Sequence, residues 1–257
     1  VNLSLALVSA VDYKHQAPND FNILERTDRN ATHQWEEMAS VSVARYAYDG
    51  VEDLNGKLYF VGGRSGTTNF TITERYDPSA NQWEILATMP NTRGGLCSAF
   101  LDGKLYAIGG EGRSTVDLYD PLSDSWSTGP SLPYVVDGAA AITFQDKIYL
   151  IGGGSMGTIR DSVFELNATS NTWIQKTSMP TARVGLRLLQ YEGKIWAIGG
   201  YHATQGAKST VEIYDPSNDS WTTGNSLNIE RNYPVVWKEQ GKLFVGGGHA
   251  KDNSFLN

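Results

Sequence analysis

A pair of glycines recurs five times along this chain at a nearly constant interval, and a fixed period of this length constrains the fold more strongly than local propensity does. Successive pairs are separated by 47, 43, 47 and 48 residues. Each pair ends an apolar segment, and a lysine five residues upstream marks a short polar turn of the hairpin type. The pairs are Gly62-Gly63, Gly109-Gly110, Gly152-Gly153, Gly199-Gly200 and Gly247-Gly248.

An aromatic residue and then a tryptophan follow each of the first four glycine pairs. The two are nine residues apart in the third copy along the chain and seven apart in the other three. An Asp-Pro step lies between them in three copies and is typical of a type I turn, so each copy contains a second hairpin. The segment that ends at Trp35 reads as an N-terminal copy of the same pattern. The aromatic pairs are Tyr76 with Trp83, Tyr119 with Trp126, Phe164 with Trp173, and Tyr214 with Trp221.

Two hairpins per copy predict four short strands in each unit. Such a unit cannot bury both faces alone, whereas radial stacking of several units buries them all. We therefore predict an all-β β-propeller, with the paired glycines at crowded strand ends near the axis and the tryptophans buried between blades. Residues 5–10 read as a further second strand. The prediction is thus six blades, with the first and last incomplete in this chain.

The alternative is five blades, in which residues 21–28 and 34–38 complete a blade begun at the C-terminus. In the six-blade reading about 30 to 40 further residues are needed to close the ring, so we expect an incomplete domain. Residues 1–257 form one propeller domain in this prediction. The expected blades are 1–40, 41–90, 91–133, 134–180, 181–228 and, in part, 229–257.

The repeated di-glycine with its spaced tyrosine and tryptophan resembles the kelch repeat over nearly the whole chain. The segments RYDPSANQWEILATMP and MPNTRGGLCSAFLDGKLYAIGG look most like the kelch domains of BTB-kelch adaptor proteins. The resemblance implies that function lies in the loops at the mouth of the central channel, where such domains contact peptide ligands. It also implies a protein-interaction module rather than an enzyme.

Two sets of positions carry this expectation. The post-glycine positions directly follow each glycine pair, and the slot positions lie upstream of each inner hairpin. By the resemblance, Arg64 and Tyr201 from the first set and Arg93 and Arg183 from the second are ligand-binding candidates, with Arg45 and Arg231 in the same slot. The post-glycine positions are Arg64, Glu111, Gly154, Tyr201 and His249. The slot positions are Arg45, Arg93, Val136, Arg183 and Arg231.

Mouth arginines suit a carboxylate, because two parallel N–H groups match its two oxygens. The predicted partner is therefore a protein or an acidic peptide. A structural alternative is that the arginines hold the blades together by pairing with acids such as Glu74, Asp117 or Glu212. A second functional hypothesis is a sugar-handling propeller similar to sialate mutarotases or a lectin, with the arginines on a carboxylated sugar.

Composition and motifs exclude several other classes. The net charge of −7 argues against general binding to nucleic acid or to anionic membranes, and the longest N-terminal apolar run is too short to span a bilayer. We find no catalytic constellation and expect no cofactor. His202 and His249 are the only paired metal-site candidates, and Cys97 is expected in the core. The compartment is open: the cytoplasm is slightly favoured, while five N-x-Ser/Thr sequons keep an extracellular location in view.

Overall fold

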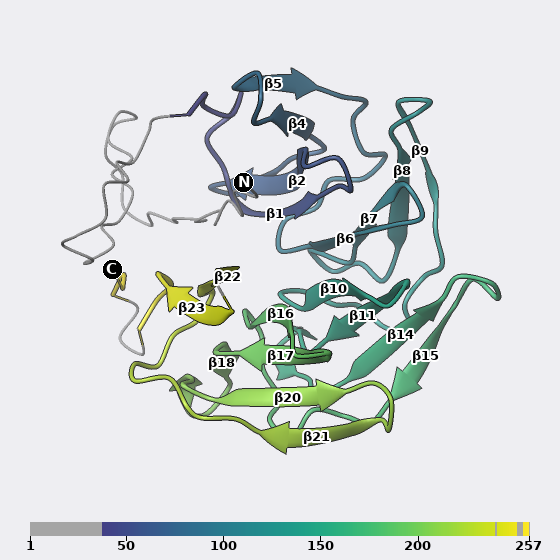
Figure 1. The fold of residues 1–257 in the computed structure, drawn as a ribbon. Helices are drawn as coiled ribbons and strands as arrows, with labels where there is room; N and C mark the ends of the chain where they lie inside the picture. Colours follow the sequence, from purple (N-terminus) through teal and green to yellow (C-terminus); the bar gives the residue numbers. More distant parts are fainter. Residues whose placement is uncertain (1–37, 240, 251–253, 257) are drawn as a thin grey trace.

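The computed structural model describes residues 38–239, 241–250 and 254–256. All regular elements in this part of the chain are β-strands, which confirms the all-β prediction (Figure 1). The strands are β1 Tyr46–Glu52, β2 Leu58–Ser65, β3 Thr68–Asn69, β4 Thr73–Asp77, β5 Gln82–Ile85, β6 Cys97–Leu101, β7 Lys104–Ile108, β8 Val116–Asp120, β9 Ser125–Thr128, β10 Ala140–Phe144, β11 Lys147–Ile151, β12 Gly154–Ser155, β13 Thr158–Ile159, β14 Val163–Asn167, β15 Thr172–Lys176, β16 Arg187–Tyr191, β17 Lys194–Ile198, β18 Tyr201–His202, β19 Gly206–Ala207, β20 Val211–Asp215, β21 Ser220–Thr223, β22 Val235–Glu239 and β23 Lys242–Gly246.

Four antiparallel sheets, each containing a four-strand meander, are arranged around a common axis (Figure 1). Their strand orders are β1-β2-β4-β5, β6-β7-β8-β9, β10-β11-β14-β15 and β16-β17-β20-β21. The short strand β3 pairs with β2 in the first sheet, and β12-β13 and β18-β19 form separate two-stranded sheets. The hairpin β22-β23 begins a further sheet. These sheets fall within the ranges predicted for blades two to six. The predicted first blade lies almost wholly outside the described residues, so the count of six stays a prediction.

The hydrophobic core lies between neighbouring sheets rather than at one centre. One cluster joins Tyr59 and Val61 of β2 to Leu105 and Tyr119 of the next sheet, and all four are nearly inaccessible to solvent. Equivalent clusters join the second sheet to the third and the third to the fourth. Since each sheet is buried on the faces that its neighbours cover, stacking supplies the burial that one sheet cannot achieve alone.

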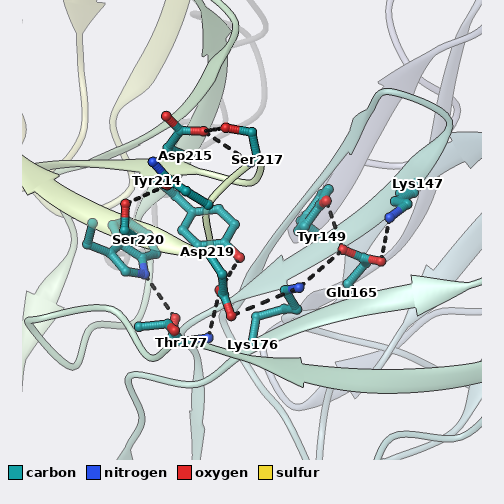
Figure 2. Close-up of polar contacts among 12 residues, drawn as sticks. Lys147, Tyr149, Glu165, Lys176, Thr177, Tyr214, Asp215, Ser217, Asp219 and Ser220 are labelled. Atoms are coloured by element: carbon teal, nitrogen blue, oxygen red, sulfur yellow. Dashed lines mark hydrogen bonds and ion pairs between the residues drawn. The ribbon is translucent and has the colours of Figure 1, made fainter.

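The outer hairpin of each sheet binds the chain that leaves the preceding sheet. The indole N–H of Trp126 donates to the carbonyl of Ala87 at 2.8 Å, and the Asp124 carboxylate accepts bonds from the Ala87 N–H and the Tyr119 hydroxyl. The backbone N–H and the carbonyl of Ala87 are thus both hydrogen-bonded by the next sheet. The same arrangement joins Trp221, Asp219 and Tyr214 to Thr177, and Trp83, Asn81 and Tyr76 to Ala39 (Figure 2 shows Tyr214, Asp219 and Thr177).

The tryptophans occupy equivalent positions, as the repeat predicted. Trp83, Trp126, Trp173 and Trp221 each face the third strand of their own sheet at the start of the fourth. They are half-buried rather than fully buried, because the indole N–H reaches the surface chain of the preceding sheet. Trp35 lies outside the described residues.

The prediction that Phe164 is the aromatic partner of Trp173 is wrong. Leu166 faces Trp173 across the β14-β15 hairpin. Phe164 lies two residues before Leu166 and is paired with Leu150 of β11. In this sheet Trp173 donates to the carbonyl of Pro130, which has no N–H to offer in return. The polar arrangement of the other sheets is therefore reduced here to a single hydrogen bond.

The innermost contacts between sheets are backbone hydrogen bonds that run around the axis. The N–H of Gly95 donates to Ala47, Gly138 to Gly95, Gly185 to Gly138 and Tyr233 to Gly185, at 2.8 to 2.9 Å. All five residues have positive φ. Glycine adopts this conformation readily, whereas an alanine or a tyrosine adopts it at a cost in free energy.

The paired glycines are fixed by close backbone approach as well as by dihedral angle. Gly152 has φ +70°, and a Cβ there would lie 2.5 Å from the carbonyl oxygen of Arg183. The N–H of Gly153 donates to that same oxygen at 2.8 Å. A side chain at the first glycine would push the slot residue away and break this bond.

Candidate ligand-binding mouth

The two sets of loop positions identified in the sequence lie beside each other at the mouth, the end of the propeller where the inner strands begin. The residues that directly follow three slot positions form isolated β-bridges with post-glycine positions. The bridges join Asp137 to Gly154, Val184 to Tyr201 and Asn232 to His249. The two sets therefore build one surface.

Arg93 links two neighbouring sheets. Its backbone belongs to the first, where its carbonyl accepts from Gly63 and its N–H donates to Phe70. Its guanidinium extends into the second, where it pairs with Asp117 at 2.7 Å and donates to the carbonyl of Gly109. The side chain is 0% exposed.

The other slot arginines are also buried. Arg183 pairs with Glu212 at 2.7 Å, and Arg45 with Glu74 at 2.6 Å in a contact without hydrogen-bond geometry. Burial lowers the pKa of Arg183, against the opposing effect of Glu212. Arg231 donates to the carbonyl of Gly247 at 2.6 Å. Arg231 is paired with no acid among the described residues. The guanidinium groups of Arg45, Arg93 and Arg183 are buried against the acids that the structural alternative named. The geometry therefore favours that alternative for them.

The sheet that lacks a slot arginine also lacks the acid. Val136 takes the slot position, and Phe164 takes the strand position occupied elsewhere by Asp117 or Glu212. Both side chains are buried in one apolar cluster, and the Phe164 ring contacts Tyr134 edge-on at 5.6 Å. A buried ion pair in the neighbouring sheets is thus replaced by a hydrophobic contact.

Arg64 and Tyr201 differ from the slot arginines because both are partly open to solvent at the mouth. The Arg64 guanidinium carbon lies 5.1 Å from the ring centroid of Tyr46. Its Nε is buried and has no hydrogen-bond partner among the residues described. Glu111, the next post-glycine residue, is exposed.

A pocket of about 470 Å³ lies at the mouth between the hairpins β12-β13 and β18-β19. Sequence reasoning identified Tyr201 in its lining but not Asp137 or Tyr233. Burial raises the pKa of Asp137, although backbone N–H groups of Gly112 and Glu111 and the charge of Arg64 oppose this rise. The lining residues include Asp137, Met156, Ile159, Val184, Tyr201 and Tyr233.

Tyr233 is one of the five positive-φ residues that the backbone bonds around the axis join, and its side chain lies over Gly138 and Gly185. A Cβ on Gly185 would lie 3.0 Å from its ring, and one on Gly138 would lie 3.2 Å from its hydroxyl. The sequence does carry a signal for it: the residue two after each slot position is Gly95, Gly138 or Gly185 in the middle sheets and Tyr233 in the last.

Charged residues also occur on the inner strands below the mouth. Asp49 accepts bonds from the backbone N–H and the hydroxyl of Ser98 in the next sheet, at 2.6 and 2.9 Å. Burial raises the pKa of Asp49, and the charge of Arg187 opposes this effect. The Arg187 guanidinium carbon lies 6.0 Å from the Tyr233 ring centroid. Charged residues therefore lie on the innermost strands, and one of them, Arg187, is close to the Tyr233 ring.

The histidines do not form a metal site within the described ranges, where no group of three or more His, Cys, Asp or Glu residues is placed to hold an ion. His202 lies near the Thr204 hydroxyl, and the His249 ring is 4.6 Å from that of Phe255. Residues 38–239, 241–250 and 254–256 also contain no helix suited to crossing a membrane.

Comparisons with known proteins agree with this architecture. The kelch motif model matches residues 51–90, 92–133, 137–180 and 182–228, which correspond to the four complete sheets. A solved structure titled "Structure of YjhT" superposes with a TM-score of 0.76 at 20% identity, covering 89% of this chain and 85% of that one. At this identity the likeness supports the fold alone.

Curated relatives match shorter stretches. Kelch-like protein 35 of Mus musculus is 36% identical over 83 residues, which is 32% of this chain and 14% of the relative. Kelch-like protein 33 of Homo sapiens is 40% identical over 78 residues, or 30% of this chain and 14% of the relative. An F-box/kelch-repeat protein of Arabidopsis thaliana is 32% identical over 83 residues, or 32% of this chain and 22% of the relative. The match thus spans less than a quarter of each relative, and the motif over most of this chain shows that it belongs to the kelch-repeat family.

Proposed function

We propose that this chain is a non-enzymatic protein-interaction module that binds a carboxylate-bearing partner segment at the mouth of its propeller. The observation that carries the proposal is Arg64, a cation at the mouth that forms no ion pair with the described residues and whose buried Nε has no hydrogen-bond partner among them. Tyr201, across the mouth in β18, offers a ring and a hydroxyl to the same segment. The kelch motif supports an interaction role, since the resemblance to the kelch domains of BTB-kelch adaptor proteins implies contact with peptide ligands at this mouth.

The slot arginines have an indirect part in this proposal. Arg93, Arg183, Arg231 and Arg45 hold the loops that carry the mouth residues, whereas Arg64 makes the contact with the carboxylate. A charge-assisted hydrogen bond contributes about 1.5 to 3 kcal/mol, so Arg64→Gln should weaken carboxylate binding by about one to two orders of magnitude.

The test uses two immobilised peptide libraries that differ only in carrying Glu and Asp or Gln and Asn. We expect the chain to retain acidic peptides preferentially, with binding that weakens as salt is added. Arg64→Gln should abolish the preference, while Lys104→Gln, the same loss of charge at the start of β7, should preserve it. Equal retention of both libraries, or an Arg64→Gln variant that binds like wild type, contradicts the proposal.

The same assay addresses the sugar hypothesis. N-acetylneuraminic acid carries one carboxylate on a compact ring and serves as the probe. Saturable binding of this sugar, lost in Arg64→Gln and unmatched by any acidic peptide, would favour the carbohydrate function over the peptide function.

A further inference from the structure

The pocket at the mouth has the opposite charge from the one that an acidic ligand requires. Asp137 is the one charged side chain among the described residues that line it. Its Oδ1 is buried without a hydrogen-bond partner in the described part of the chain, although backbone N–H groups of Gly112 and Glu111 lie close enough to the carboxylate to act on its pKa. A buried carboxylate oxygen in this condition is costly, and a cation or an N–H donor that enters the pocket would relieve that cost.

The remaining lining suits a long side chain that ends in a charge. Tyr201 and Tyr233 supply two aromatic rings, whose faces attract cations. Val184, Ile159 and Met156 supply apolar surface, and Met156 is 95% exposed at the tip of the β12-β13 turn. Lysine and arginine combine an aliphatic stem with a cationic end, so their stems match the apolar part and their ends match Asp137.

We propose that this pocket binds a lysine or arginine side chain of the partner segment, with Asp137 as its counter-ion and Tyr201 and Tyr233 beside it. This inference rests on the proposed function, because it assigns a second contact to the same segment. Charge complementarity supports the choice of occupant, since the chain as a whole carries a net charge of −7. The segment recognised would carry an acidic residue for Arg64 and a basic residue for Asp137.

Other charges near the pocket also act on Asp137. Burial raises the pKa of Asp137; the charge of Arg64 opposes this rise, and the charge of Glu111 adds to it. Arg187 lies 6.0 Å from the Tyr233 ring centroid but is absent from the lining, so it does not occupy the pocket.

The first experiment titrates the 1–257 chain with N-acetyl-arginine amide and with N-acetyl-citrulline amide, which has nearly the same shape without the charge. Backbone amide shifts of Gly138 and Val184 report occupancy by NMR. We expect saturable shifts with the arginine probe and at least about tenfold weaker binding of the citrulline probe. Equal affinities, or shifts confined to another surface, overturn the inference.

Variants then identify the counter-ion. Asp137→Asn should weaken binding of the arginine probe by about tenfold or more, because it removes the charge and keeps the size of the side chain. Glu111→Gln is the matched control: it removes an exposed acid from the same mouth and should leave affinity within about twofold. A folded Asp137→Asn variant with wild-type affinity rejects the assignment.

Substitution of Tyr201 tests the aromatic contact with the arginine probe independently of Asp137. Tyr201→Phe retains the aromatic face and should bind the probe as wild type does, whereas Tyr201→Leu should bind it several-fold more weakly. Identical behaviour of the two variants removes the ring from the site.

Arg64→Gln separates this inference from the proposed function. The variant should lose acidic peptides but keep the arginine probe. If wild type ignores acidic peptides yet binds the arginine probe through Asp137, the proposed carboxylate contact fails and the cation pocket stands. If wild type selects acidic peptides but does not bind the arginine probe, the carboxylate contact stands and the cation pocket fails.

Discussion

Arg183 and Glu212 form an ion pair of 2.7 Å between two sheets, with side-chain exposures of 0% and 4%. The backbone of Arg183 is bonded to the sheet that it follows, and Glu212 lies in β20 of the next sheet. The pair therefore ties one sheet to its neighbour, and Arg93 with Asp117 does the same between the first two sheets.

Arg183→Met should destabilise the chain by about 3 to 5 kcal/mol, because it leaves the Glu212 carboxylate buried without a counter-charge. Urea unfolding followed by tryptophan fluorescence measures the change. The double variant Arg183→Val with Glu212→Phe copies the Val136 and Phe164 arrangement of the preceding sheet. It should recover much of the lost stability, since replacing a buried pair by apolar residues is often neutral. A double variant less stable than Arg183→Met contradicts this account.

Gly152→Ala should be more damaging than Gly103→Ala. Both glycines have positive φ, at +70° and +74°, and this conformation alone costs an alanine about 1 to 2 kcal/mol. Only at Gly152 does the added Cβ meet a backbone oxygen, that of Arg183, whereas the space around Gly103 is open. We expect a further loss of about 1 to 3 kcal/mol at Gly152, measured by urea unfolding. Equal losses at the two sites would mean that dihedral strain alone fixes the glycine pair.

The Asp124 carboxylate should make stability depend on pH. The N–H of Ala87 and then the Tyr119 hydroxyl lower the pKa of Asp124 below its usual value of 3.8. Its contribution is therefore present above that value and is lost as pH falls through the lower pKa of the folded state. Asp124→Asn should be less stable than wild type at pH 7, with the difference closing in acid. Asn81→Asp, the converse change at the equivalent position, should add stability at pH 7 and lose it on acidification.

Cys97 should be unreactive in the folded protein. Its side chain is 3% exposed, and burial raises the pKa of its thiol well above the usual value, so little thiolate is present. A thiol reagent such as Ellman's should modify it only as fast as the protein unfolds. The exposed replacement Ser127→Cys provides the comparison, and a Cys97 that reacts as rapidly as that cysteine would contradict its place in the core.

The repeat was sufficient to predict four strands per unit and the positions of the four described tryptophans, but not the short strands β3, β12-β13 and β18-β19. It misassigned Phe164 because aromatic character was given priority over spacing. Leu166 lies seven residues before Trp173, the interval found in the other copies, and that interval follows from the fixed length of the outer hairpin. Register therefore decides which residue faces the tryptophan, whatever its side chain.

The roles of the slot arginines were harder to separate, because a repeated position serves either a ligand at the axis or contacts between sheets. One signal was present in the sequence. Arginine and acid occur together in the repeats and are lost together where Val136 and Phe164 replace them. Paired loss of this kind is typical of two residues that contact each other. Asp137 carried no comparable pattern, and Tyr233 was marked only by standing where the three preceding repeats have glycine.

The backbone bonds from Ala47 through Gly95, Gly138 and Gly185 to Tyr233 run around the channel rather than along it. The peptide dipoles in this arc follow one another tangentially, unlike those of a helix, which add along one axis and generate a potential at its ends. An arc of this kind gives the channel little polarity from end to end. This arc therefore adds little to the electric field that a ligand meets at the mouth, where the charges of side chains such as Arg64 and Asp137 act directly.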